Sequence, residues 1–254
     1  MSELRTALVG LARDKATGNV RVGHEGVVHL VAGAAVFAEC VFVPGLGRML
    51  SSSGRLREAD WRAVQASGSA EDFLGRAELE GYGLIALFDA AYYLLGSDAP
   101  VEFSEGDPFW LAPLRGVPIE TLYYETGRRR ERLDQAWPSA VLDDAPVVPV
   151  RRVRRQRVML TGLQAELLLN ADGRLDAAGL ARELGHTRYG CTLAVRGLAA
   201  SGLVAVPPGS ARRRIGGAPR GRPDRADGSP GPQKWAEVDQ SLLLRLTDAL
   251  RELE

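Results

Sequence analysis

The stretch that decides the fold of the C-terminal half is HTRYGCTLAVRGLAASGLVAV, residues 186–206. With 3.6 residues per turn, its apolar side chains recur on one helical face, formed by Cys191, Ala194, Val195 and Leu198. We expect this face to be buried in a core. The opposite face, which we expect to point outward, carries Arg188, Thr192, Arg196 and, nearly in line, Ala199. Gly202 is expected to end the helix before a short strand, LVAV.

The outward face combines side chains that can contact DNA. Guanidinium groups such as those of Arg188 and Arg196 bind guanine edges and phosphates, and threonine contacts a thymine methyl group. The free N–H groups at a helix N-terminus also bind phosphate. An alternative interpretation is that both arginines are solvated surface residues, as most arginines on helices are.

Three expected helices precede the short strand. The first spans residues 161–170, Asp176 caps the second, and the third begins at Thr187 or Arg188. The segment LDAAGLARELGHTRYGCTLAVRGLAASGLVAV, with a basic tip GSARRRI behind it, resembles the winged helix-turn-helix family over residues 158–214. No second wing strand is evident after Ile215.

The resemblance implies which side chains contact double-stranded DNA. On the third helix these are Arg188, Tyr189, Thr192 and Arg196, and at the wing Arg212, Arg213 and Arg214. Arg154 and Arg155, in the basic segment ahead of the domain, are expected to add phosphate contacts. Since many winged-helix domains bind proteins, a protein partner remains an alternative.

The N-terminal half predicts a mixed fold. Residues 2–14 have helical periodicity with Ser2 as a cap, and residues 16–40 read as three antiparallel strands joined by short glycine turns. Beyond Pro44 the pattern favours helices, and we expect them at 46–56, 58–67, 70–81 and 83–96, with Ser69 as a cap. A short strand at 99–106 and a helix at 118–138 complete a domain that ends near Asp144.

Residues 17–40, followed by PGLGRMLSSSGRLREADW, resemble the PATAN-type domain, a bacterial family linked to signalling proteins. The small residues of that pattern stand at Gly18, Gly26, Gly33 and Ala38. Tight hairpins need such glycines for conformational reasons alone. The resemblance covers residues 4–60 well and extends loosely to 140, and it implies a platform for a protein or small-molecule signal without catalytic residues.

Charge divides the chain although its formal net charge is zero. Residues 1–145 hold 14 basic and 21 acidic residues, a net charge of −7, whereas residues 146–233 hold 15 and 6, a net charge of +9. We therefore expect a polyanion to contact the second part. Residues 145–158 predict an extended basic linker, residues 216–233 a disordered linker, and residues 234–254 an amphipathic tail helix.

Several classes of function are disfavoured. No apolar run reaches the roughly 20 residues that cross a bilayer and no signal peptide is evident, so we expect a cytoplasmic protein without membrane contact. Cys40 and Cys191 are isolated, and the three histidines lack metal-ligand spacing, so neither a disulfide, a metal site nor a cofactor is expected. The acidic pair Asp143–Asp144 is attributed to a solvated linker, and no catalytic motif is found.

These features predict an α+β protein with an antiparallel β-meander domain at 1–144, a linker at 145–158, a winged helix-turn-helix domain at 159–215, a second linker and the tail helix. The first hypothesis is a homodimeric bacterial transcriptional regulator that binds double-stranded DNA. The alternative is a non-catalytic signalling adaptor, in which the winged helix and the tail helix bind protein partners or a second copy of the chain.

Overall fold

The computed structural model describes residues 3–67, 75–107, 109, 115–153 and 157–207. All of them belong to one compact unit, which spans Met1–Arg213. The expectations for Ser2, Ser69, the second linker and the tail helix therefore lie outside the described residues, as do those for the arginines at 154, 155 and 212–214.

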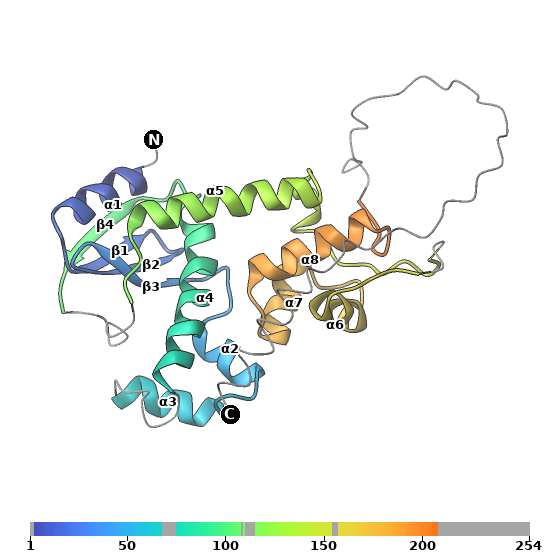
Figure 1. Ribbon diagram of the computed structural model, residues 1–254, viewed down its shortest axis with the longest axis horizontal. Coiled ribbons are helices and arrows are strands. Elements are labelled where there is room, and N and C mark those ends of the chain that lie inside the picture. The colour runs from blue at the N-terminus through green and yellow to red at the C-terminus, as the bar shows by residue number, and fades with distance from the viewer. Residues whose placement is uncertain (1–2, 68–74, 108, 110–114, 154–156, 208–254) are drawn as a thin grey trace, which may run out of the picture. The chain divides into compact units, whose positions relative to one another are not determined.

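A four-stranded antiparallel sheet organises the N-terminal part, as the α+β prediction requires (Figure 1). The strands are β1 (Gly18–Val22), β2 (Gly26–Val31), β3 (Ala34–Cys40) and β4 (Val101–Glu105). Their order is β3-β2-β1-β4, so the predicted meander is confirmed, and the distant strand β4 pairs with β1.

Three helices share the largest hydrophobic core with this sheet, namely α1 (Glu3–Arg13), α4 (Arg76–Leu94) and α5 (Ile119–Ala136). Leu4 and Leu8 of α1 are almost fully buried, as the helical periodicity predicts. A second cluster joins β3 to α2 (Leu46–Ser52) and α3 (Glu58–Ser67). The expected break between residues 81 and 83 is wrong, because α4 runs through both glycines and packing outweighs their low helix propensity.

The C-terminal part of the described chain is a helical triad, α6 (Gly162–Asn170), α7 (Ala177–Leu184) and α8 (Arg188–Ala200). The predicted cap at Asp176 is confirmed, because its side chain accepts a hydrogen bond from the backbone N–H of Gly179. The side chains of Thr161 and Thr187 cap α6 and α8 in the same way. The predicted core face of α8 is also confirmed, since Cys191 and Leu198 have no exposed surface.

The segment that was expected to be a linker packs against this triad. The N–H of Val147 donates to the carbonyl of Leu175 at 2.8 Å, and the N–H of Val150 donates to the carbonyl of Leu203 at 2.9 Å. The strand expected after α8 is reduced to one antiparallel bridge, between Pro149 and Val204. The extended segment ahead of α6 thus pairs with the chain that leaves α8.

Gly185 makes a close contact between α7 and α2. It ends α7 with a φ of +72°, and a Cβ atom there would overlap the side chain of Ser52. Gly54 has a similar φ of +70°, but a Cβ atom there would meet nothing within 4 Å. Alanine substitutions at the two glycines therefore distinguish the cost of backbone strain, which both share, from the cost of steric overlap, which only Gly185 has.

We expect Gly185→Ala to lower the free energy of unfolding more than Gly54→Ala does. Gly54→Ala carries only the strain of a left-handed backbone, about 1 kcal/mol. Gly185→Ala adds the overlap with Ser52, for a total of about 2–4 kcal/mol. Urea denaturation measures both changes, and Ser52→Gly in the Gly185→Ala background should recover part of the loss. Equal losses in the two single variants would contradict the contact.

Candidate functional site: the second face of helix α8

Helix α8 is buried on both of its faces. The face expected to meet DNA packs against α5 and α4. The exposed fraction is 3% for both Thr192 and Arg196, and Tyr189 and Ala199 are buried as well. The expectation that this face points outward is therefore wrong for the described structure. The physical reason is that α4 and α5 offer it carboxylates, carbonyls and aromatic rings.

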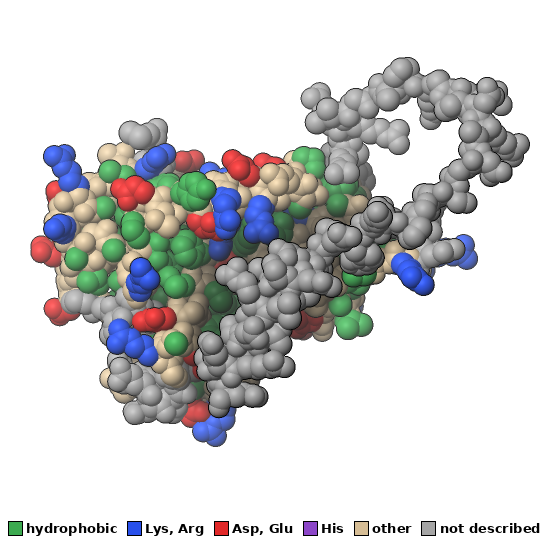
Figure 2. All heavy atoms as spheres, in the orientation of Figure 1, with side chains coloured by type: hydrophobic (Ala, Val, Ile, Leu, Met, Phe, Trp, Pro, Cys, Tyr) green, Lys and Arg blue, Asp and Glu red, His purple; other side chains and the backbone are tan. Residues whose placement is uncertain are grey.

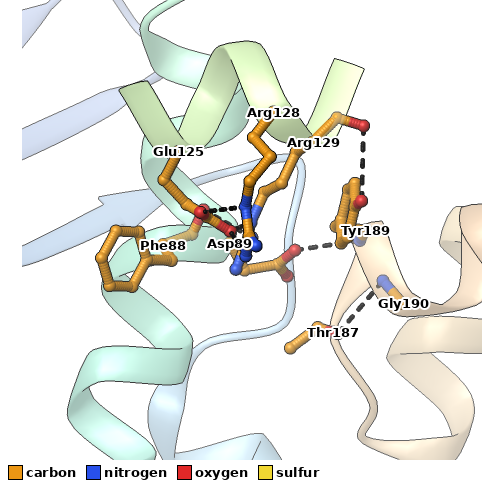
Figure 3. Close-up of polar contacts among 8 residues, drawn as sticks. All are labelled: Phe88, Asp89, Glu125, Arg128, Arg129, Thr187, Tyr189 and Gly190. Carbon is orange, nitrogen blue, oxygen red and sulfur yellow. Dashed lines mark hydrogen bonds and ion pairs between the residues drawn. The ribbon is translucent and has the colours of Figure 1, made fainter. Parts of the chain in front are cut away.

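Asp89, in the middle of α4, binds the N-terminus of α8 (Figure 3). Its side chain has no exposed surface. One carboxylate oxygen accepts the N–H of Arg188 at 2.8 Å, and the other accepts the N–H of Tyr189 at 2.9 Å. The local cap from Thr187 takes the next donor, the N–H of Gly190, at 3.2 Å. The side chains of Asp89 and Thr187 thus satisfy three of the free N–H groups with which a helix begins.

Burial raises the pKa of the Asp89 carboxyl group to about 6, because a charge is disfavoured away from water. The hydrogen bonds from Tyr189 and Arg188 and the positive charge of Arg129 oppose this effect. The group is therefore ionised at neutral pH, and its negative charge lies at the positive end of the α8 dipole.

The guanidinium group of Arg196 donates hydrogen bonds to three residues. It forms a bidentate pair with Asp143, at 2.7 and 2.6 Å. It also donates to the carbonyl of Trp137 at 2.7 Å and to Asp134 at 3.5 Å. Burial alone would lower the pKa of Arg196, but the hydrogen bonds and charge of Asp143 outweigh it and the pKa is raised. Arg196 therefore keeps its positive charge, and its N–H donors point into the molecule.

The guanidinium group of Arg188 also contacts other residues of the same chain. Its guanidinium carbon lies 4.5 Å from the centre of the Tyr93 ring, a cation–π geometry. Its terminal nitrogens reach the carbonyl of Phe42 and a carboxylate oxygen of Asp144, each at 3.4 Å. The attribution of the pair Asp143–Asp144 to a solvated linker is therefore wrong for Asp143, which pairs with Arg196 and is largely covered. Asp144 pairs with Arg188 but keeps a side chain that is 79% exposed.

Tyr189 contacts α5 through Arg129 (Figure 3). The tyrosine hydroxyl donates to the backbone carbonyl of Arg129 at 3.3 Å, and the guanidinium carbon of Arg129 lies 4.7 Å from the tyrosine ring centre. Arg129 donates in turn to the carbonyl of Phe88 at 2.9 Å and to Glu125 at 3.3 Å. Hydrogen bonds from Arg128 and then Arg129 lower the pKa of Glu125.

We call the four carboxylates that bind α8 the acidic clasp; its members are Asp89, Asp134, Asp143 and Asp144. The expected DNA-contacting residues of α8 are thus brought together, but around carboxylates of the same chain. Sequence reasoning overlooked Asp89. The available signal was a single acidic residue inside the apolar run GLIALFDAAYYLLG, where a carboxylate needs a partner.

Cys191, on the core face of α8, has no exposed surface. Burial raises the pKa of the Cys191 thiol to about 12, which keeps it protonated and unreactive at neutral pH. Among the described residues, no group of three or more His, Cys, Asp or Glu side chains could hold a metal ion. None of the helices described is long and apolar enough to cross a membrane. The geometry is that of an intramolecular interface.

Comparison with protein-family models, with curated proteins and with solved structures finds no match for this chain.

Asp89 predicts a specific pH dependence of stability. Between about pH 4 and pH 6 the folded protein binds more protons at Asp89 than the unfolded chain does, because burial raises this pKa from 3.8 to about 6. The contribution of Asp89 to stability therefore falls as the pH rises through that window and is constant above it. Asp89→Asn has no such titration.

The free energy of unfolding of the wild type minus that of Asp89→Asn should consequently decrease from pH 4 to pH 6 and level off above pH 7. Urea denaturation of both proteins at four pH values measures this difference. A difference that is constant with pH would show that Asp89 is not buried against α8.

The pair Arg196–Asp143 should be strongly coupled. We expect Arg196→Ala to cost about 3–5 kcal/mol, because it removes a buried guanidinium group and leaves the partly buried carboxylate of Asp143 without its cation. A double-mutant cycle with Asp143→Ala should give a coupling energy of at least about 1.5 kcal/mol. Arg57 and Asp60 form a bidentate pair of similar geometry on the surface, and the same cycle there should give a much smaller value. Equal coupling in the two cycles would contradict the buried arrangement.

Proposed function

We propose that this chain is a non-catalytic interaction protein, a signalling adaptor whose helix-turn-helix-like triad is a protein-binding unit. The observation that carries the proposal is the burial of the polar face of α8, with Arg196 only 3% exposed. A duplex cannot reach that face while α4 and α5 cover it. DNA recognition by a helix needs its side chains at the base edges, within hydrogen-bonding distance.

Two surface features support a protein partner. Large apolar side chains are exposed in and just ahead of α6, with exposed fractions of 95% for Met159, 40% for Leu160 and 86% for Leu169. Large exposed apolar groups at both ends of one short helix offer contacts that a protein partner can bury. On the face that Figure 2 shows, arginine side chains of the described residues lie among acidic and apolar ones. A mixed surface of this kind offers DNA little of the clustered positive charge it needs.

The second candidate is the DNA-binding transcriptional regulator, with the acidic clasp closed in the described state. A specific observation favours it: the carboxylates of the clasp bind the groups that a phosphate backbone would bind. Asp89 takes the N–H groups at the N-terminus of α8, and Asp143 takes the guanidinium group of Arg196. In this candidate, DNA would compete with the clasp, and binding would require α8 to leave α4 and α5.

Opening the clasp distinguishes the two candidates. We would compare the full-length wild type with Asp89→Asn/Asp143→Asn, which keeps the side-chain shapes and removes two charges. The fluorescence anisotropy of a labelled duplex, measured between 50 and 200 mM salt, reports DNA binding. Circular dichroism confirms that both proteins keep their helices.

The adaptor proposal predicts that the double variant binds DNA no more tightly than the wild type at any salt concentration. The regulator candidate predicts tighter binding that falls by orders of magnitude with salt. Adding Arg196→Ala to the double variant provides the control, since only a DNA-contacting α8 would then lose affinity again. Tighter binding that depends on Arg196 would overturn the adaptor proposal.

A further inference from the structure

A cavity of about 540 Å³ lies on the N-terminal part of the chain. Its lining comes from the turn between β1 and β2, from β3, and from helices α2 and α3. The side chains that define its chemistry are Phe37, Trp61, Phe109, Arg21, Arg48 and Glu39. The volume is within the range of pockets that hold small organic molecules.

One wall of the cavity is built from parallel aromatic rings. The ring centres of Phe37 and Phe109 are 5.4 Å apart and their planes differ by 7°. The ring of His29 stacks behind Phe109, with centres 4.0 Å apart and planes at 19°. Trp61 lies against the backbone of Gly47, where a Cβ atom would overlap the indole ring. Flat apolar surfaces of this kind favour a flat apolar ligand.

The charged groups of the lining favour an anion. Two of them are arginines, Arg21 and Arg48, and among the described residues of the lining Glu39 alone is acidic. Arg21 is exposed and forms no ion pair with the described residues. Arg48 donates to the backbone carbonyls of Arg182, at 3.0 Å, and Glu183, at 3.4 Å. These partners are neutral, and Arg48 forms no ion pair with a carboxylate of the described residues, although its charge acts on Glu58 at longer range.

Glu39 is directed toward another group. Its carboxylate lies 3.7 Å from Nε2 of His29, and that nitrogen is buried and has no hydrogen-bond partner among the described residues. The other ring nitrogen, Nδ1, lies 2.7 Å from the amide oxygen of Asn19. The interaction with His29 lowers the pKa of Glu39, so this carboxylate is ionised, and the two arginines of the lining outnumber its negative charge.

We propose that this cavity is a binding site for a small anionic molecule with a flat, aromatic body. The aromatic wall would hold the body, and Arg21 and Arg48 would hold the anionic group by charge-assisted hydrogen bonds. The site goes beyond the proposed adaptor function, because it gives the N-terminal part a chemical ligand. It does not depend on whether α8 binds protein or DNA.

Two fluorescent probes of matched shape test the proposal on the full-length protein. One is 8-anilinonaphthalene-1-sulfonate, which is anionic, and the other is N-phenyl-1-naphthylamine, its neutral analogue. We expect the folded protein to bind one anionic probe per chain in a saturable manner. The neutral probe should bind the same cavity more weakly, because it lacks the charge that the arginines recognise.

Arg21→Glu tests the role of charge, and Arg13→Glu is its matched control. Arg13 is exposed at the end of α1 and does not line the cavity, so both variants change the net charge equally. Arg21→Glu should weaken binding of the anionic probe about 10-fold or more and leave the neutral probe within about twofold. Arg13→Glu should leave both probes within about twofold.

Gln65→Trp tests the location of the site. Gln65 is an exposed residue of the lining, and an indole ring there would fill part of the cavity. Both probes should then lose most of their affinity, while thermal melting shows that the variant remains folded. The proposal is overturned if no saturable binding occurs, if Arg21→Glu and Arg13→Glu have equal effects, or if Gln65→Trp leaves both probes bound.

Discussion

The arrangement of the described chain depends on the buried carboxylate of Asp89 at the N-terminus of α8. Removing an ionised carboxylate from water is costly, and the raised pKa of Asp89 reflects that cost. Two backbone N–H groups and the dipole of α8 offset it. Because these donors exist only at the first turn of a helix, the contact fixes which turn of α8 faces α4. This contact in turn places Tyr189 against α5 and brings Arg196 to Asp143.

Internal pairing explains part of the division of charge along the chain. The acidic N-terminal region and the basic region behind it suggested different external partners. In the structure, carboxylates from the first region, Asp134, Asp143 and Asp144, pair with arginines of α8. A strongly basic segment is thus not by itself a sign of a polyanionic ligand. The groups that would serve a phosphate backbone serve equally well to hold two parts of one chain together.

The acidic clasp and the cavity beside β3 are two different sites at which the molecule could bind a partner or a ligand. The clasp governs whether the second face of α8 is available to any partner. The cavity offers a different chemistry, with aromatic rings and two arginines on the lining. Arg48 belongs to the cavity lining and also binds the end of α7 through backbone carbonyls. The two parts of the described chain therefore share more than the α8 interface.

The sequence by itself determined the features that depend on near neighbours. The cap at Asp176, the start of α8 at Arg188 and the β-meander were predicted correctly, because a cap or a tight turn involves residues only a few positions apart. Only the tertiary structure decided what covers the second face of α8. The helix is amphipathic in sequence, and the arginines of its second face can be solvated by water, bind DNA or pair with carboxylates. The choice was made by Asp89, which binds the N-terminus of α8 from about 100 positions away, and by Asp143, which binds Arg196 from 53 positions away. No local pattern encodes contacts over such separations.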